Sequence, residues 1–512
     1  MSLAFPLLIM LGALAIAGIA HRRHIQPGLV IVLLASAVSF IPGLPRLQLP
    51  PEVILGLVVP PLLYSAAYNT SIGQFRRNLQ PILALGVGLV VVTTLVGAYF
   101  THWLLPSLGL SMAFVLASVV SPPDTVTTVS HGREYGLTRR VQSILIGESL
   151  VNDAIALTLF ALALNAVAHQ HVVSENPVLL FLYQAVVGLA VGTLLGAVSN
   201  AVRSRMQQAQ LETAFGFILP FAAYLSAEVF HASGILAVVA AAFCVSLNTL
   251  YDPRVIHRYT YRTRLQESQF WPVVDTLLEA FVFAYMGLQL RFVLDDLRAS
   301  GEPFGHTLLV GLAVTALIML VRMVWALAVF HPRVLAWFGK LRVRRGQRGG
   351  VPRQPELLTG RENVLIGWTG MRGIITLAAA AGVPLTLENG EPFPGRAVIQ
   401  TVAFIVTITT LLVQGATLPL LSRRLRIDTS GDAAQEKEEL VQAYRTAKTA
   451  PADDFPAQRR MLGQAMLRGE VQESAARTVM LRLDLEQSAQ TLSEKEARGG
   501  RVPAGTFDPP SS

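Results

Sequence analysis

The sequence is poor in charged residues and almost devoid of cysteine. Asp, Glu, Lys and Arg make up only 14% of its 512 residues, whereas 52% are hydrophobic and the mean hydropathy is +0.50. These values lie far from the average of soluble globular proteins and indicate a polytopic membrane protein. The one cysteine, Cys244, excludes an intramolecular disulfide.

Two motifs of intramembrane enzymes are also missing. No apolar segment contains Gly-x-Ser-x-Gly or His-Glu-x-x-His, so we expect neither an enzyme nor a cofactor. The net charge of +8 comes mostly from arginines in short loops between apolar runs. A basic cytoplasmic face of a membrane protein, in contact with lipid, explains them better than a nucleic-acid partner.

Thirteen apolar segments are long enough, or nearly so, to cross about 30 Å of hydrocarbon at about 1.5 Å per residue. They cover residues 3–20, 27–42, 52–69, 80–100, 109–130, 141–165, 178–199, 211–229, 234–250, 270–290, 306–330, 363–382 and 396–421. Arginines gather in alternate loops. This pattern predicts a multi-pass protein of the cell (inner) membrane, with its amino terminus outside and its carboxyl terminus in the cytoplasm.

The odd number of spans allows an internal symmetry. If spans 1–6 and 8–13 are two copies joined by span 7, the copies are inverted repeats, a plan common in secondary transporters. The fifth span of each copy is interrupted by helix-breaking residues, at Ser121–Thr125 and at Thr369–Gly373. Corresponding breaks in two halves indicate a binding site at the membrane midplane. Asp124 and Arg372 would compensate the partial charges of the half-helix ends there.

The segment 141–165 contains the most polar cluster of any span. Glu148, Ser149, Asn152 and Asp153 interrupt an otherwise apolar run. A charged side chain costs about 2.5–3.5 kcal/mol to insert at the bilayer centre, so two carboxylates in one helix indicate an ion path. Residues four apart share a helix face, which places Ser149 beside Asp153 and Glu148 beside Asn152.

Oxygen ligands in this arrangement suit a hard monovalent cation. Asp153 supplies a carboxylate, Ser149 a hydroxyl, and Pro123 a backbone carbonyl, since proline keeps its acceptor. Removal from water favours the protonated form of a carboxylate, so one group can hold either a proton or a cation. Competition for that group would couple the flux of the cation to that of the proton, with the cation bound at Asp153 and Ser149.

Simpler structural roles compete with this interpretation. The Ser149 hydroxyl can bond back to its own helix, and Asp124 can cap a half helix. For three further charged residues of the apolar spans the sequence indicates no role: Glu228, Glu279 and Arg322.

Five stretches together carry a family resemblance. They are Val59–Tyr64, Pro122–Asp124, Gly147–Asp153, Ala227–Ala237 and Gly370–Gly373. In this order and in these spans they resemble the cation:proton antiporter-1 family, the bacterial and animal sodium/proton exchangers. The resemblance covers residues 1–425 and implies homodimers with a dimer-forming scaffold and a mobile core.

The resemblance also implies roles for single residues. Asp153 matches the transport carboxylate, Ser149 matches a cation ligand, and Asn152 is the asparagine typical of electroneutral members. Electrogenic relatives often use an intramembrane lysine, whereas all four lysines here lie in a loop or the tail. Glu148 and Arg372 match an intramembrane ion pair that orients the asparagine.

Two departures from the family pattern concern the ion site. Some members have a glutamate directly after the Pro-Pro-Leu-Leu-Tyr run, where this chain has Ser65. The break in span 5 usually reads Thr-Asp-Pro, but here Pro123 precedes Asp124 and Thr125 follows it. Ser65 and Thr125 are therefore expected neighbours of the site, and the preferred ion stays open.

Residues 426–512 differ sharply in composition from the apolar region. They are polar, with amphipathic helices predicted at 436–447 and 456–496 and a Gly/Pro/Ser-rich, disordered end at 498–512. We expect a small cytoplasmic helical tail.

The sequence therefore predicts an electroneutral antiporter that exchanges Na⁺, with Li⁺ as a further candidate, for H⁺. A K⁺/H⁺ antiporter of the same fold is the nearest alternative. An ion channel or a membrane receptor is the alternative from a different class.

Overall fold

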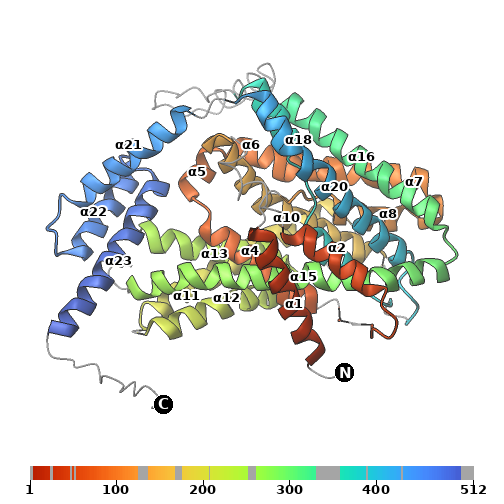
Figure 1. Ribbon diagram of the computed structural model, residues 1–512, viewed down its shortest axis with the longest axis horizontal. Coiled ribbons are helices and arrows are strands. Elements are labelled where there is room, and N and C mark those ends of the chain that lie inside the picture. Colours follow the sequence, from red (N-terminus) through yellow and green to blue (C-terminus); the bar gives the residue numbers. More distant parts are fainter. Residues whose placement is uncertain are drawn as a thin grey trace, which may run out of the picture.

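The computed structural model of the protein describes residues 4–22, 27–46, 49–50, 53–124, 137–167, 176–206, 208–251, 261–329, 358–387, 390–427 and 430–497. Most of these residues are helical, and their only extended pairing is an isolated bridge between Thr386 and Pro392. The predicted all-α fold is confirmed for this part of the chain (Figure 1).

The first half of the chain contains eleven described helical elements. They are α1 (Ala4–Arg22), α2 (Pro27–Ser39), the π-helical turn η1 (Ile54–Val58), α4 (Val59–Asn69), α5 (Ile72–Arg77), α6 (Leu79–Leu83), the π-helical turn η2 (Ala84–Leu89), α7 (Val90–Leu104), the short 3₁₀ turn η3 (Pro106–Leu108), α8 (Leu110–Val120) and α10 (Arg139–Val167).

The second half of the membrane region and the tail contain eleven more. They are α11 (Pro177–Arg203), α12 (Ala209–Val229), α13 (Gly234–Tyr251), α15 (Tyr261–Ala299), α16 (Phe304–Val329), α18 (Gly360–Trp368), α19 (Ile374–Ala381), α20 (Arg396–Leu425), α21 (Ser430–Ala447), α22 (Phe455–Arg468) and α23 (Glu473–Ala497).

Helices lie at each of the thirteen apolar segments predicted from the sequence. Among the described residues, six helices are long and apolar enough to cross a membrane, judged by length and composition. They are Leu79–Leu104, Arg139–Val167, Val178–Arg203, Tyr261–Ala299, Phe304–Val329 and Arg396–Leu425. Five shorter apolar helices of 10–17 residues accompany them. The chain is a multi-pass helical membrane protein, and thirteen crossings stay a prediction.

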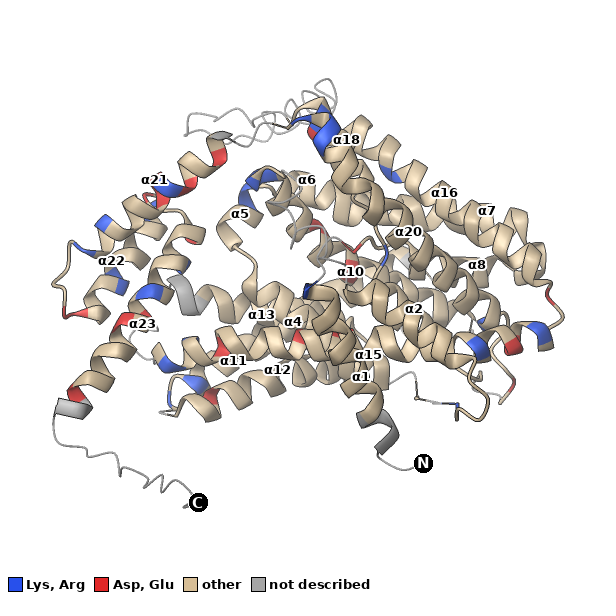
Figure 2. Cartoon of the chain, in the orientation of Figure 1, with Lys and Arg blue, Asp and Glu red and all other residues tan. Residues whose placement is uncertain are grey.

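The outer surface of the helical bundle is apolar. Val178 and Leu194 of α11, for example, expose 66% and 65% of their surface. Charged side chains gather instead at helix ends and on α21–α23 (Figure 2). An apolar belt of this kind is what contact with lipid requires.

Among the described residues, helices end at both predicted breaks. α8 ends at Val120, directly before Ser121-Pro122-Pro123, because proline lacks a backbone donor and disfavours helix in the residue before it. α18 ends at Trp368 and α19 begins at Ile374, so the glycine-containing stretch between them is not helical.

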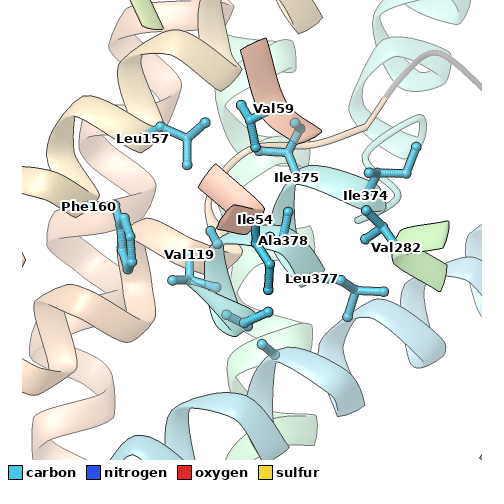
Figure 3. Packing of buried hydrophobic residues seen from close by; sticks show 14 of the residues in the cluster. Ile54, Val59, Val119, Leu157, Phe160, Val282, Ile374, Ile375, Leu377 and Ala378 are labelled. Carbon is cyan, nitrogen blue, oxygen red and sulfur yellow. The ribbon is translucent and has the colours of Figure 1, made fainter. Parts of the chain in front are cut away.

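The short helix α19 lies at the centre of the largest apolar cluster. All eight of its residues are buried, and four of them are consecutive alanines, which let neighbouring helices approach closely. Side chains from several elements meet around it (Figure 3): Ile54, Val59, Val119, Leu157, Phe160 and Val282. The broken segment is therefore held on every side by packing.

The tail forms three helices instead of the two predicted. The predicted helix 456–496 is interrupted at Gly469, which has a φ of +73° and ends α22 in the left-handed conformation that glycine adopts without strain. α21, α22 and α23 bury their own apolar cluster, centred on Ala443, Leu462 and Leu483. Residues 498–512, predicted to be disordered, lie outside the described residues.

Helices α21–α23 lie beside the membrane region (Figure 1), and hydrogen bonds join them to several of its helices. Asp432 accepts from the backbone N–H of Arg139, at the start of α10, over 2.7 Å. Arg264 of α15 donates two hydrogen bonds to Asp484 at 2.6 and 2.7 Å. Glu473 accepts from the backbone N–H of Gly73 in α5 over 2.7 Å.

Close contact between α11 and α13 gives a test of this packing. A Cβ at Gly192 would lie 2.7 Å from the Cα of Ala237, so backbone would have to move. We expect Gly192→Ala to lower stability by about 1–3 kcal/mol, as overpacking does. Thermal unfolding in detergent should show a clearly lower midpoint.

Gly18→Ala is the matched control. Gly18 lies inside a helix as Gly192 does, but outside its own helix backbone no atom of the described residues lies within 4 Å of a Cβ built there. Its midpoint should be unchanged or higher, since alanine favours helix over glycine. Equal midpoints for the two variants would show that α11 and α13 are not in close contact.

Candidate functional site

The two helix breaks lie against each other. The backbone N–H of Asp124 donates to the carbonyl oxygen of Met371 over 2.6 Å. The carboxylate of Asp124 lies so close to Gly373 that a Cβ at that position would collide with it. A side chain at 373 is thereby excluded, and the interruptions of both helices form one crossing.

Arg372 satisfies the exposed carbonyls at this crossing. Its guanidinium donates to the carbonyls of Val120 at 3.0 Å and Ser121 at 3.2 Å, and also to that of Gly370. Its own backbone N–H donates to the Thr410 hydroxyl at 3.0 Å. The last carbonyls of a helix carry partial negative charge, so a buried cation is stabilised where α8 ends.

The expected ion pair between Glu148 and Arg372 is corrected by the structure. Both carboxylate oxygens of Glu148 accept from Arg322 of α16, one of them over 2.9 Å. Arg322 also donates to the carbonyl of Ile366 at 3.2 Å. The physical reason is that backbone carbonyls engage the guanidinium of Arg372, while Arg322 reaches Glu148 in the bidentate geometry that favours arginine–carboxylate pairs. The sequence had indicated no role for Arg322.

Asn152 connects the site helix α10 to the first break. Its amide Nδ2 donates to the carbonyl of Pro123 at 2.9 Å, and the side chain is fully buried. Among the described residues its Oδ1 has no hydrogen-bond partner. The Pro123 carbonyl thus binds the amide, and its second lone pair is left for another donor or a cation.

Asp153 and Ser149 line a cavity of about 340 Å³ beside the crossing. One helical turn separates them, so they share a face of α10, as the spacing predicts. Ile374 and Ile375, at the start of α19, close one side of this cavity. Its polar lining consists of Ser65, Asn69, Thr70, Asp124, Ser149, Asp153, Asp275 and Glu279.

Two of these carboxylates come from α15. Asp275 was missed in the sequence, and Glu279 received no role there. Asp275 and Glu279 are four residues apart in an apolar run, as Ser149 and Asp153 are. The same spacing could therefore have identified them from the sequence. Ser65 of α4 donates its hydroxyl to Asp275 Oδ2 over 2.6 Å. Ser65 is thus next to a carboxylate after all, one that the facing helix α15 supplies.

Other predicted residues lie elsewhere. Thr125 falls outside the described residues. Glu228 is exposed at the end of α12 and does not line the cavity. Within the described part of the chain, no group of three or more His, Cys, Asp or Glu side chains is arranged to hold a metal ion.

Comparison with known proteins gives the family. The profile described as "Sodium/hydrogen exchanger, transmembrane" matches residues 8–424. The chain belongs to this family. It is a multi-pass transporter of the class that exchanges monovalent cations for protons, and the family is not one of enzymes.

Relatives and solved structures agree with the assignment. This exchanger is similar to an uncharacterized Na⁺/H⁺ exchanger of Mycobacterium tuberculosis, with 31% identity over 498 residues that cover 96% of this chain and 86% of the relative. It is also similar to the "Sodium, potassium, lithium and rubidium/H(+) antiporter" of Bacillus pumilus, with 28% identity over 89% of this chain and 67% of the relative.

Among solved structures, the sodium proton antiporter MjNhaP1 of Methanocaldococcus jannaschii matches with a TM-score of 0.62 and 17% identity. The match covers 82% of this chain and 98% of that structure. At this identity the likeness establishes the fold of the exchanger.

The corrected pairing can be tested by double-mutant cycles. Removing one partner of a buried ion pair typically costs about 3–5 kcal/mol, because the other charge is left unpaired. We expect Glu148→Gln and Arg322→Gln each to lower the free energy of unfolding strongly, and the double variant to lose clearly less than the sum.

The matched cycle uses Glu148→Gln with Arg372→Gln. Arg372 donates to backbone carbonyls and not to Glu148. The losses in free energy of unfolding of the two single variants should therefore be closer to additive, with a smaller coupling energy. A larger coupling energy for Glu148 with Arg372 than with Arg322, measured by unfolding in mixed detergent, would reinstate the pair expected from the sequence.

Proposed function

We propose that this exchanger carries out electroneutral exchange of one monovalent cation for one proton. Na⁺ is the first candidate for the cation, and Asp153 is the group that binds either the cation or the proton. One observation supports this most. Asp153 faces the cavity at the crossing, while the two arginines buried near it are bonded elsewhere, Arg322 to Glu148 and Arg372 to backbone carbonyls. The charge of Asp153 is therefore available to a cation from solution.

Competition for this carboxylate explains coupling and electroneutrality. Asp153 with a bound proton and Asp153 with a bound Na⁺ carry the same net charge. The site therefore has the same charge when it changes sides with either ion, and one full cycle moves no net charge. Asn152 next to it is uncharged and bonded to Pro123. Ser149, one turn away, and Asp124 at the break would supply the further oxygens that a dehydrated cation requires.

The relatives support Na⁺ and keep K⁺ open. The family description names sodium, and a relative in Aphanothece halophytica is named a Na⁺/H⁺ antiporter. The Bacillus pumilus relative is named for sodium, potassium, lithium and rubidium. K⁺/H⁺ exchange is thus the second candidate, while a channel or receptor does not fit a family of exchangers.

The proposed architecture has thirteen crossings in two inverted repeats, α1–α10 and α12–α20, joined by α11. Contact between the breaks of the fifth span in each repeat supports it, since such repeats place their broken helices together at the midplane. The arginine-rich loops then lie in the cytoplasm with the tail. Asn69 and Thr70 line the cavity at the end of α4 that this topology assigns to the cytoplasm, so we expect the cavity to open inward. We further propose a homodimer.

Asp153→Asn tests the exchange site. An amide cannot alternate between a proton and a cation, so we expect cation-dependent proton flux in proteoliposomes to fall to the level of empty liposomes. Thermal unfolding should stay close to that of the wild type. Asp295→Asn, an exposed carboxylate on α15, is the matched control and should retain full flux. Wild-type exchange by Asp153→Asn would refute the proposal.

A clamp on membrane potential tests electroneutrality. Flux driven by Na⁺, Li⁺ or K⁺, with choline as the blank, should be the same with and without the clamp. Asn152→Asp would add a carboxylate beside Asp153, and we expect its flux to respond to the clamp. A voltage-dependent wild-type flux would contradict the one-for-one exchange, and the ranking of the three cations names the substrate.

A further inference from the structure

The α15 side of the cavity carries two carboxylates opposite the exchange site. Asp275 and Glu279 are four residues apart on α15, so both project from one face of that helix. Ser149 and Asp153 project from α10 into the same cavity. The exchange mechanism above uses the α10 side and leaves Asp275 and Glu279 without a role.

One hydrogen bond orients the carboxylate of Asp275, and only one of its two oxygens takes part in it. The hydroxyl of Ser65, itself 1% exposed, donates to Oδ2 over 2.6 Å. The other oxygen, Oδ1, is buried from solvent and has no hydrogen-bond partner among the described residues. Buried carboxylate oxygens that serve only structure are normally satisfied by donors. An oriented acid with an unpartnered oxygen is suited to binding a cation.

The lining of the cavity favours cations over anions. Four carboxylates line it, from Asp124, Asp153, Asp275 and Glu279, and none of its described lining residues is basic. Leucine and isoleucine side chains make up much of the remaining wall, which lowers the local dielectric and strengthens the field. The volume of about 340 Å³ holds on the order of ten waters at about 30 Å³ each, enough for a partly hydrated ion.

We propose that Asp275, positioned by Ser65, together with Glu279, binds the entering cation on α15 before its transfer to Asp153. This α15 site sets the apparent affinity for the cation, whereas Asp153 sets the coupling to the proton. The inference rests on the proposed exchange function. In this view the cation loses its hydration shell in two steps, first against α15 and then against α10.

The test measures cation-dependent proton flux in proteoliposomes over a range of Na⁺ concentrations. For Asp275→Asn we expect the KM for Na⁺ to rise about tenfold, the lower end of the enrichment that a cleft of one charge sign produces, with kcat within about twofold of wild type. Ser65→Ala should shift KM in the same direction by less, since the carboxylate remains but loses its orientation.

An exchange of the two side chains separates charge from packing. Ser65→Asp combined with Asp275→Ser restores one hydroxyl and one carboxylate across the same contact. If the local charge alone determines the KM for Na⁺, this KM should return to within about threefold of wild type. Asp295→Asn, on the same helix but exposed and outside the cavity, should leave KM and kcat unchanged.

The outcomes distinguish this inference from the exchange function. Wild-type KM in Asp275→Asn, or a lower kcat with unchanged KM, would overturn the α15 site while Asp153→Asn still shows no exchange. If Asp153→Asn retains exchange, the proposed function itself fails. If Asp275→Asn does not fold, Ser65→Ala decides, because it keeps the carboxylate of Asp275 and removes only the hydroxyl that orients it: a raised KM supports the site and a wild-type KM overturns it.

Discussion

The structure depends on how hydrogen bonds are satisfied where two helices stop within an apolar bundle. A helix end leaves carbonyls and amides without intrahelical partners, and hydrocarbon supplies none. At the crossing, Arg372 covers the last carbonyls of α8, the amide of Asn152 covers Pro123, and backbone joins Asp124 to Met371. The buried, apolar helix α19 begins directly after the second break and packs beside these polar groups. Two interrupted helices become a rigid crossing because nearly every exposed group has a partner.

The same bonds decide which charge is left for a substrate. Five charged side chains lie at or beside the crossing, yet the two positive ones are each bonded: Arg322 to Glu148, and Arg372 to the negative end of α8. Neither forms an ion pair with Asp153 among the described residues. Both buried positive charges are thus compensated within the protein, and the carboxylate of Asp153 can respond to the composition of the solution.

Much of this arrangement follows from local sequence. Helical spacing places Ser149 and Asp153 on one face, and Pro122-Pro123 and Gly370–Gly373 end helices by backbone chemistry alone. The partner of Glu148 does not follow, because Arg322 and Arg372 are both buried arginines far along the chain and only packing decides between them. Asp275 and Glu279 could have been recognised by their helical spacing within the span 270–290, but only packing shows that they face Asp153 across one cavity. The division of the predicted helix 456–496 at Gly469 could have been predicted, because glycine commonly ends helices.

The tail connects the two sides of the cavity. Asp432 and Glu439 bind Arg139 at the start of α10, the helix of Asp153, while Asp484 binds Arg264 near the start of α15, the helix of Asp275. Any shift of α10 relative to α15 must therefore stretch or break one of these contacts, or carry the tail with it. If α10 moves relative to α15 during transport, tail docking and the position of the ion site are thermodynamically linked, and such a linkage is reciprocal. A ligand, lipid charge or modification that binds only the undocked tail would change ion affinity, and the ions inside the cavity would in turn change how tightly the tail is held.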